Sequence, residues 1–209
     1  LPSKIKHQIT IPTDDQILLA IQSADGYMPL IIRVASSLGL RRAEICALTW
    51  ADISNGSLNI DKALAKNPEK QWVLKAPKSF AGTRTVTVPP ALLSLILSSR
   101  PEGALDSDRI FPVNPDYITK HWYLLCKSLG FTCRFHDLRH YNASVMLSLG
   151  VPDKYAMQRM GHATTNMLKT VYQHLINEKE KQEYAKIDSY MSKFSEMQHE
   201  MQHDSQKAQ

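Results

Sequence analysis

Strand-like sequence is confined to a short middle part of the chain. Residues 57–61 and 71–76 resemble strands, and TRTVTVP at 83–89 alternates most clearly, with Gly82 supplying the turn between the last two. From Pro90 onward the pattern is helical almost throughout, with breaks at Gly103, Pro112, Gly130, Gly150 and Gly161. This distribution predicts an α+β fold that is mainly α-helical, with a small antiparallel β-sheet.

The N-terminal part of the chain carries helix signals. Residues 1–12 lack periodicity and are predicted to be a linker. Thr13 and Gln16 have the spacing of a capping box, in which each residue bonds the backbone of the other at a helix start. The pattern predicts helices at residues 13–23, 28–38 and 42–48.

The last part of the chain, residues 176–209, is polar and rich in Gln, Lys and Glu. Apolar residues nevertheless recur there every three or four positions, at Ile187, Tyr190, Met191, Phe194, Met197 and Met201. This spacing predicts an amphipathic helical tail. Such a tail could pack on its own domain, fray, or dock on a neighbouring subunit, and the run of charges before it favours docking.

Composition narrows the class of protein. With 209 residues the chain can bury the core of one domain. Lys and Arg total 25 against 20 Asp and Glu, and the net charge of +5 favours a polyanionic partner. Three cysteines without CxxC spacing argue against a disulfide framework and a structural zinc site, and they favour a reducing cytosol. No signal peptide or membrane-spanning run is found, and the start at Leu1 suggests a fragment of a longer protein.

The stretch RFHDLRH places two imidazoles and a guanidinium on one helix face, because His136, Arg139 and His140 are three and four residues apart. A metal site would use both histidines, because HDLRH resembles the helix that carries two zinc-binding histidines in metalloproteases. Asp137 is shorter than the usual glutamate, however, and Arg139 would place a cation beside a dication. An anion site uses the arginine, and this interpretation is favoured.

Other candidate residues are scattered along the chain. Arg41 follows a glycine turn at a helix start, where free N–H groups favour phosphate, and Glu44 could brace it or favour the helix N-terminus. Lys78 lies near the bend of the predicted hairpin and could face solvent or donate a proton in a cleft. His162 follows Gly161, and Tyr172 alone would be an ordinary half-buried aromatic residue.

In order and spacing, these residues resemble the catalytic domain of tyrosine recombinases, the integrase family of phages and mobile elements, over residues 13–175. The resemblance carries the family's catalytic residues onto Arg41, Lys78, His136, Arg139, His162 and Tyr172. The hairpin matches least, because Ser79 stands where the family usually has threonine. Lys75 is therefore an alternative for the lysine role.

The resemblance implies site-specific DNA recombination, integration or excision, through tyrosine attack on a DNA phosphodiester. The products would be a 3′-phosphotyrosyl bond and a free 5′-hydroxyl. Arg41 and Arg139 would clamp the phosphate, His136 would accept the proton of Tyr172, and Lys78 would protonate the leaving oxygen. His162 would bond a phosphate oxygen or the leaving group. No metal, ATP or other cofactor is implied.

The resemblance also implies an assembly. Its members act on double-stranded DNA as homotetramers that exchange C-terminal segments, which would give residues 176–209 a purpose. Residues 1–12 would then lead from a preceding DNA-binding domain, and the enzyme would work in the bacterial cytosol or nucleoid, without a membrane. The alternatives are a type IB topoisomerase-like enzyme, a non-catalytic DNA-binding protein and a zinc hydrolase. The Gly161-His162 pair and the chain length favour the recombinase over the topoisomerase.

Overall fold

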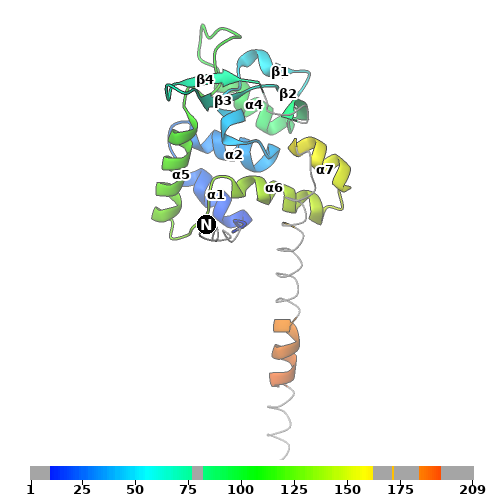
Figure 1. The fold of residues 1–209 in the computed structure, drawn as a ribbon. Helices are drawn as coiled ribbons and strands as arrows, with labels where there is room; N and C mark the ends of the chain where they lie inside the picture. The colour runs from blue at the N-terminus through cyan, green and yellow to red at the C-terminus, as the bar shows by residue number, and fades with distance from the viewer. Residues whose placement is uncertain (1–9, 77–81, 162–170, 172–183, 194–209) are drawn as a thin grey trace, which may run out of the picture. The chain divides into compact units, whose positions relative to one another are not determined.

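The computed structural model describes residues 10–76, 82–161, 171 and 184–193. The chain divides into two compact units, residues 1–169 and 170–209. The first unit contains two small sheets and most of the described helices (Figure 1). Its helices are α1 (Asp14–Ser23), α2 (Met28–Leu38), α3 (Arg42–Ile45), α4 (Pro90–Ser98), α5 (Pro115–Ser128), α6 (Asp137–Ser148), α7 (Asp153–Met160) and the 3₁₀ turn η1 (Trp50–Asp52). The strands are β1 (Ile53–Ser54), β2 (Ser57–Ile60), β3 (Ala63–Lys66), β4 (Trp72–Lys75) and β5 (Arg84–Thr87).

Helix α2 is the centre of the first unit. It packs against α1 and α6 on one side and contacts α3 and α4 on the other, so it lies between the sheet end of the unit and the lower helices (Figure 1). Seven of its residues are buried, among them Ile31, Ile32 and Leu38. Because it is buried on more than one face, α2 fixes the position of the loop at its C-terminal end, which begins with Gly39.

Helix α1 begins as the sequence predicts. The Thr13 hydroxyl accepts a hydrogen bond from the Gln16 backbone N–H at 3.2 Å, and the Gln16 side chain accepts one from the Thr13 N–H at 3.0 Å. The predicted capping box is therefore confirmed. The third predicted helix is shorter than expected. Helix α3 ends at Ile45, because the backbone then tightens into bonds from Ala47 to Glu44 and from Leu48 to Ile45.

The strands pair differently from the prediction. Strand β2 lies between β1 and β5, with Ile60 opposite Arg84, whereas β4 pairs with β3, with Ala63 opposite Lys75. The predicted hairpin between residues 71–76 and 83–89 is therefore wrong, because those two strands belong to different sheets. The α+β fold with small antiparallel sheets is confirmed.

A turn that the sequence analysis did not recognise explains this difference. The Asn67 side chain accepts a hydrogen bond from the Gln71 N–H at 2.8 Å, and Lys70 adopts a left-handed φ of 62°. These contacts close a hairpin between β3 and β4. Residues 77–81, which include Lys78, follow β4 in the sequence and lie outside the described residues.

The second unit is described at Val171 and at residues 184–193, which are helical. Ile187, Tyr190 and Met191 are exposed on this helix. The structure is helical over these ten residues, while the amphipathic tail over 176–209 and its docking on a neighbour stay predictions. Among the described residues, no helix combines the length and apolar character needed to cross a membrane.

Gly39 allows α2 to end against α6 and α7. Its φ of +64° is left-handed, and a Cβ there would lie 2.8 Å from the Asn142 Oδ1 atom and 2.6 Å from the Met160 Sδ atom. Both the backbone conformation and the close contacts require glycine.

Gly39→Ala should lower the free energy of unfolding by about 2–4 kcal/mol, because left-handed strain and overpacking add together. Urea denaturation would measure the loss. Gly103→Ala is the control: its φ is +75° with open space around it, so only the strain of about 1–2 kcal/mol is expected. Equal losses in the two variants would contradict the close packing at Gly39.

Candidate active site

Arg41 is held where α3 begins, as the N-cap residue with an extended backbone. The Glu44 Oε2 atom accepts a hydrogen bond from the Arg41 backbone N–H at 2.8 Å. The Glu44 Oε1 atom accepts one from the Arg41 guanidinium at 2.6 Å. Both roles that the sequence leaves open for Glu44, bracing the guanidinium and favouring the helix N-terminus, are therefore observed. The other end of the Arg41 guanidinium donates to the Gly161 carbonyl at 3.0 Å.

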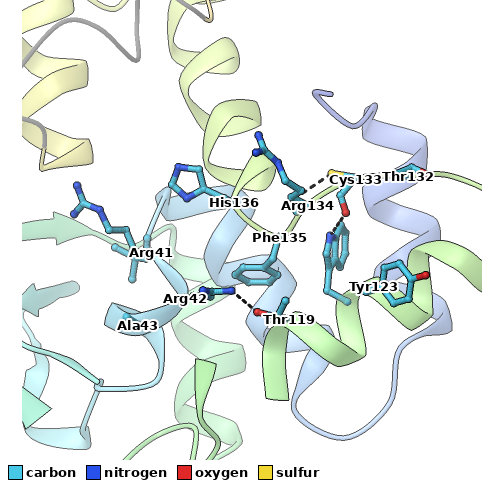
Figure 2. Close-up of a pocket in the computed structure, with 12 residues that line it drawn as sticks. Arg41, Arg42, Ala43, Thr119, Tyr123, Thr132, Cys133, Arg134, Phe135 and His136 are labelled. Atoms are coloured by element: carbon cyan, nitrogen blue, oxygen red, sulfur yellow. Dashed lines mark hydrogen bonds between the residues drawn. The ribbon is translucent and has the colours of Figure 1, made fainter. Parts of the chain in front are cut away.

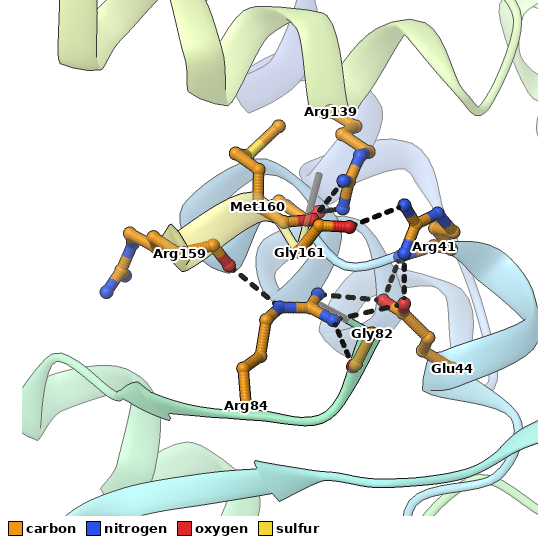
Figure 3. Close-up of polar contacts among 9 residues, drawn as sticks. Arg41, Glu44, Gly82, Arg84, Arg139, Arg159, Met160 and Gly161 are labelled. Carbon is orange, nitrogen blue, oxygen red and sulfur yellow. Dashed lines mark hydrogen bonds and ion pairs between the residues drawn. The ribbon is translucent and has the colours of Figure 1, made fainter. Parts of the chain in front are cut away.

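Arg139 approaches the same point from α6. Its side chain is almost fully buried and donates to the backbone carbonyls of Gly39 and Met160. Arg41 and Arg139 therefore bind the consecutive carbonyls of Gly161 and Met160, and Figure 3 shows the two guanidiniums next to each other at this backbone. The structure brings the two predicted arginines together.

The arginine cluster, here Arg41, Arg84 and Arg139 with Glu44, carries excess positive charge. The Glu44 carboxylate bonds the Arg41 and Arg84 guanidiniums (Figure 3), and its charge also acts on Arg139. The pKa of Arg139 is lowered to about 9, chiefly by burial and then by the positive charges of Arg41 and Arg84. The negative charge of Glu44 acts in the opposite direction. An anion bound at the cluster would offset this repulsion.

His136 immediately precedes α6 and lies beside the arginine cluster. Its ring contacts the His140 ring edge to face, with centroids 5.1 Å apart. The pKa of His136 is lowered to about 4, chiefly by desolvation of the ring and then by the charges of His140, Arg139 and Arg134. The charge of Asp137 acts in the opposite direction. The imidazole is therefore unprotonated at pH 7, and a bound anion would raise its pKa and make it a stronger base. The residue is exposed to solvent.

A cavity of about 610 Å³ opens next to these residues. Arg41 and His136 line one part of it, and Figure 2 shows Arg42 and Arg134 along the rest. Arg42 donates to the Thr119 hydroxyl, which ties α3 to α5. Three arginines and a histidine line the cavity together with apolar residues such as Trp122 and Phe135, and the basic part of this lining suits an anion.

Asp137, which lies between the two histidines of the metal interpretation, is engaged in other contacts. The Asp137 carboxylate bonds the Arg134 guanidinium at 2.8 Å and 3.2 Å, and its Oδ1 lies 3.9 Å from the His140 Nε2 atom. Asp137 therefore anchors the start of α6. Within the described ranges, no group of three or more His, Cys, Asp or Glu side chains is placed to hold a metal ion.

Three of the six predicted site residues are placed and lie together: Arg41, His136 and Arg139. Lys78, His162 and Tyr172 lie outside the described residues. The alternative lysine, Lys75, is exposed on β4 and donates to the Lys66 carbonyl across the β3–β4 hairpin at 3.4 Å.

The sequence analysis missed Arg84, which binds Glu44 from β5. A signal for it was present. The alternation that identified the strand also puts Arg84 on the same face as Val86 and Val88, and all three are buried. An arginine on the buried face of a strand requires acidic or carbonyl partners.

Comparison with known proteins gives consistent similarities. The profile of the phage integrase family matches residues 8–179. An integrase of Saccharopolyspora erythraea is 36% identical over 117 residues, covering 48% of this chain and 26% of that protein. The ICEBs1 integrase of Bacillus subtilis is 25% identical over 207 residues, covering 91% of this chain and 54% of that protein. The chain thus spans about half the length, or less, of these curated relatives.

Solved structures share the fold. The Tn1549 transposon integrase, solved in complex with transposon right end DNA, matches with a TM-score of 0.68 at 19% identity, covering 80% of this chain and 63% of that one. The XerA recombinase matches with a TM-score of 0.61 at 20% identity, covering 82% and 61%.

Proposed function

The chain belongs to the phage integrase family, and on that premise we propose that it breaks and rejoins DNA in site-specific recombination. The observation that carries this proposal is the pair of guanidiniums on consecutive carbonyls, Arg41 on Gly161 and Arg139 on Met160. Their excess charge suits one phosphodiester, whose attack by a nucleophile increases the negative charge on the non-bridging oxygens.

The proposed reaction is a transfer of the phosphoryl group to Tyr172. The phenol oxygen forms a bond to phosphorus while the bond to the 5′-oxygen breaks. His136, neutral at pH 7, accepts the phenol proton, and Lys78 donates a proton to the departing 5′-oxygen. His162 bonds a non-bridging oxygen or the leaving group. The phosphotyrosyl bond preserves the energy of the phosphodiester, so a 5′-hydroxyl from another strand can reverse the step without ATP.

Double-stranded DNA is the proposed partner, and the cavity next to the cluster supports this. Arg42 and Arg134 extend the positive surface beyond the two clamp residues, as a continuous phosphate backbone would require. The similar fold of an integrase solved on transposon DNA is a further support. The bacterial cytosol or nucleoid is the proposed location, because the proposed substrate is DNA.

The proposed assembly is a homotetramer on DNA in which the tail is exchanged between subunits. Its support is the exposure of Ile187, Tyr190 and Met191 on the helix of residues 184–193. Apolar side chains repeated at helical spacing are stabilised when a partner covers them. In this proposal the partner is the neighbouring catalytic domain.

Covalent capture on DNA tests the proposed reaction. The full chain would be incubated with a pool of random-sequence duplexes that carry nicks, so that the short cleaved strand diffuses away and the adduct accumulates. After denaturation, we expect protein-linked DNA that forms equally well with EDTA, and enrichment of the linked sequences would reveal the target site.

The alternative functions give other outcomes in the same experiment. DNA that is retained only before denaturation would indicate a non-catalytic binding protein. Cleavage that EDTA abolishes, without an adduct, would indicate a metal-dependent hydrolase. Adducts that reseal only in place, and never join a second duplex, would indicate a type IB topoisomerase-like enzyme. Each of these results would contradict the recombinase proposal.

A further inference from the structure

We propose that Arg84 is a positioning residue of the reaction, which fixes the direction of the Arg41 guanidinium by holding the Glu44 carboxylate between them. This inference rests on the proposed function. Arg84 does not line the cavity, so its effect on the phosphate would be transmitted through Glu44 alone.

The first observation is that Glu44 is saturated with donors. Its Oε1 accepts from Arg41 Nη1 at 2.6 Å and Arg84 Nη1 at 3.1 Å, and its Oε2 accepts from the Arg41 backbone N–H at 2.8 Å and Arg84 Nη2 at 2.9 Å. A carboxylate offers about four lone-pair sites, and all are used here. The bidentate pairing with Arg84 leaves the carboxylate one orientation, and that orientation sets the direction of Arg41 (Figure 3).

The second observation is that Arg84 is itself held rigidly. Its Nε donates to the Arg159 carbonyl at 2.8 Å and its Nη1 to the Gly82 carbonyl at 3.1 Å. Its side chain is 4% exposed, whereas that of Arg41 is 37% exposed. The buried arginine is therefore the fixed point, and the half-exposed one is the group that needs to be held.

The charge of Glu44 also depends on this pairing. Burial alone would raise the pKa of Glu44, but the Arg84 hydrogen bonds and charge, followed by the Arg41 charge and N–H, bring it below the ordinary value. With Arg84 in place, the carboxylate stays ionised and attracts the Arg41 guanidinium. Without it, the buried carboxylate would lose its strongest partner.

Arg84 also connects three parts of the chain that surround the reaction. It lies on β5, binds Glu44 of α3, and bonds the carbonyl of Arg159, two residues before the Gly161 carbonyl that Arg41 uses. One guanidinium thus ties the Glu44 carboxylate to the backbone that leads to the Gly161 carbonyl.

Arg84→Lys tests the inference, because lysine keeps the charge but cannot bond both carboxylate oxygens and both carbonyls. Single-turnover adduct formation would be measured on the captured duplex, together with DNA affinity and circular dichroism. We expect the rate to fall about 10- to 100-fold, as for groups that orient metal ligands, with affinity changed by no more than about twofold.

The control is Arg109→Lys. Arg109 is another partly buried arginine that bonds two backbone carbonyls, of Cys46 and Val113, but it does not touch the cluster. It should lose similar packing without slowing adduct formation. An equal slowing in both variants would mean that general structural damage is responsible.

Combining Arg84→Lys with Arg41→Lys distinguishes a positioning role of Arg84 from a purely structural one. In an Arg41→Lys protein, Arg84→Lys should slow the reaction by no more than about a further twofold, because its effect passes through Arg41. The same 10- to 100-fold loss in both backgrounds, or an unchanged rate in the single variant, would overturn the inference.

If Arg84→Lys does not fold, Glu44→Gln should show the same dependence on Arg41, and the absence of that dependence would overturn the inference equally. Failure of the wild-type chain to form adducts would instead overturn the proposed function.

Discussion

Tyr172→Phe should abolish covalent protein–DNA adducts, a loss of about 10⁴- to 10⁶-fold by analogy with removal of a protease nucleophile. Phenylalanine has no oxygen to attack phosphorus. The phenol needs the rest of the site, because ionising it at pH 7 costs about 4 kcal/mol for an ordinary pKa near 10. In the proposed reaction, the arginine cluster would lower this cost by stabilising the phenolate.

DNA affinity should change little in the same variant, by about twofold at most, since ring and backbone are preserved. Denaturing gels would measure the adduct and a retention assay the affinity. Tyr123→Phe is the matched control, because Tyr123 is exposed and lines the cavity beside Arg41 and His136. Loss of adducts in the Tyr123 variant, with persistence in the Tyr172 variant, would show that the nucleophile is wrongly assigned.

Arg41→Lys should slow adduct formation about 10²- to 10³-fold, or about 2.7–4 kcal/mol, as expected for one donor to a developing oxyanion. A lysine ammonium can replace the charge but not the fork that bonds Glu44, Gly161 and a phosphate oxygen together. Substituting Arg41 tests the clamp more cleanly than substituting Arg139, because Arg139 is 1% exposed and bonds two carbonyls inside the fold. Its loss would mix catalysis with stability.

Arg42→Lys serves as the control for the clamp. Arg42 is the next residue, lines the same cavity and bonds Thr119, but it makes no described contact with the arginine cluster. Lysine keeps the positive charge that we propose for contact with the DNA backbone, so we expect single-turnover rates at saturating DNA within about twofold of the wild type. If both variants slow equally, the effect comes from positive charge along the cavity rather than from a defined clamp at Arg41.

Local signals in the sequence located α1 and α2 correctly. The capping box at Thr13 begins α1, and α2 covers the predicted residues 28–38. The pairing of the strands depends on contacts between distant segments. The β3–β4 hairpin was missed because its turn depends on the Asn67 side chain and a left-handed lysine, neither of which resembles a glycine turn.

The candidate site shows a similar division. Spacing on a helix face identified His136 and Arg139, and the glycine turn identified Arg41. Their meeting on the carbonyls of Met160 and Gly161 could not be predicted from periodicity, because it joins residues about 20 and 120 positions apart. Arg84 was missed for the same reason: its partner Glu44 is 40 positions away.

The most direct test of the central claim is to identify the residue and the DNA end in the captured adduct. Trypsin would release residues 170–179, TVYQHLINEK, in which Tyr172 is the one tyrosine. We expect mass spectrometry to find a nucleotide 3′-phosphate on this peptide, with a free 5′-hydroxyl on the released strand. A nucleotide on any other peptide, or a linkage to a 5′-phosphate, would contradict the account.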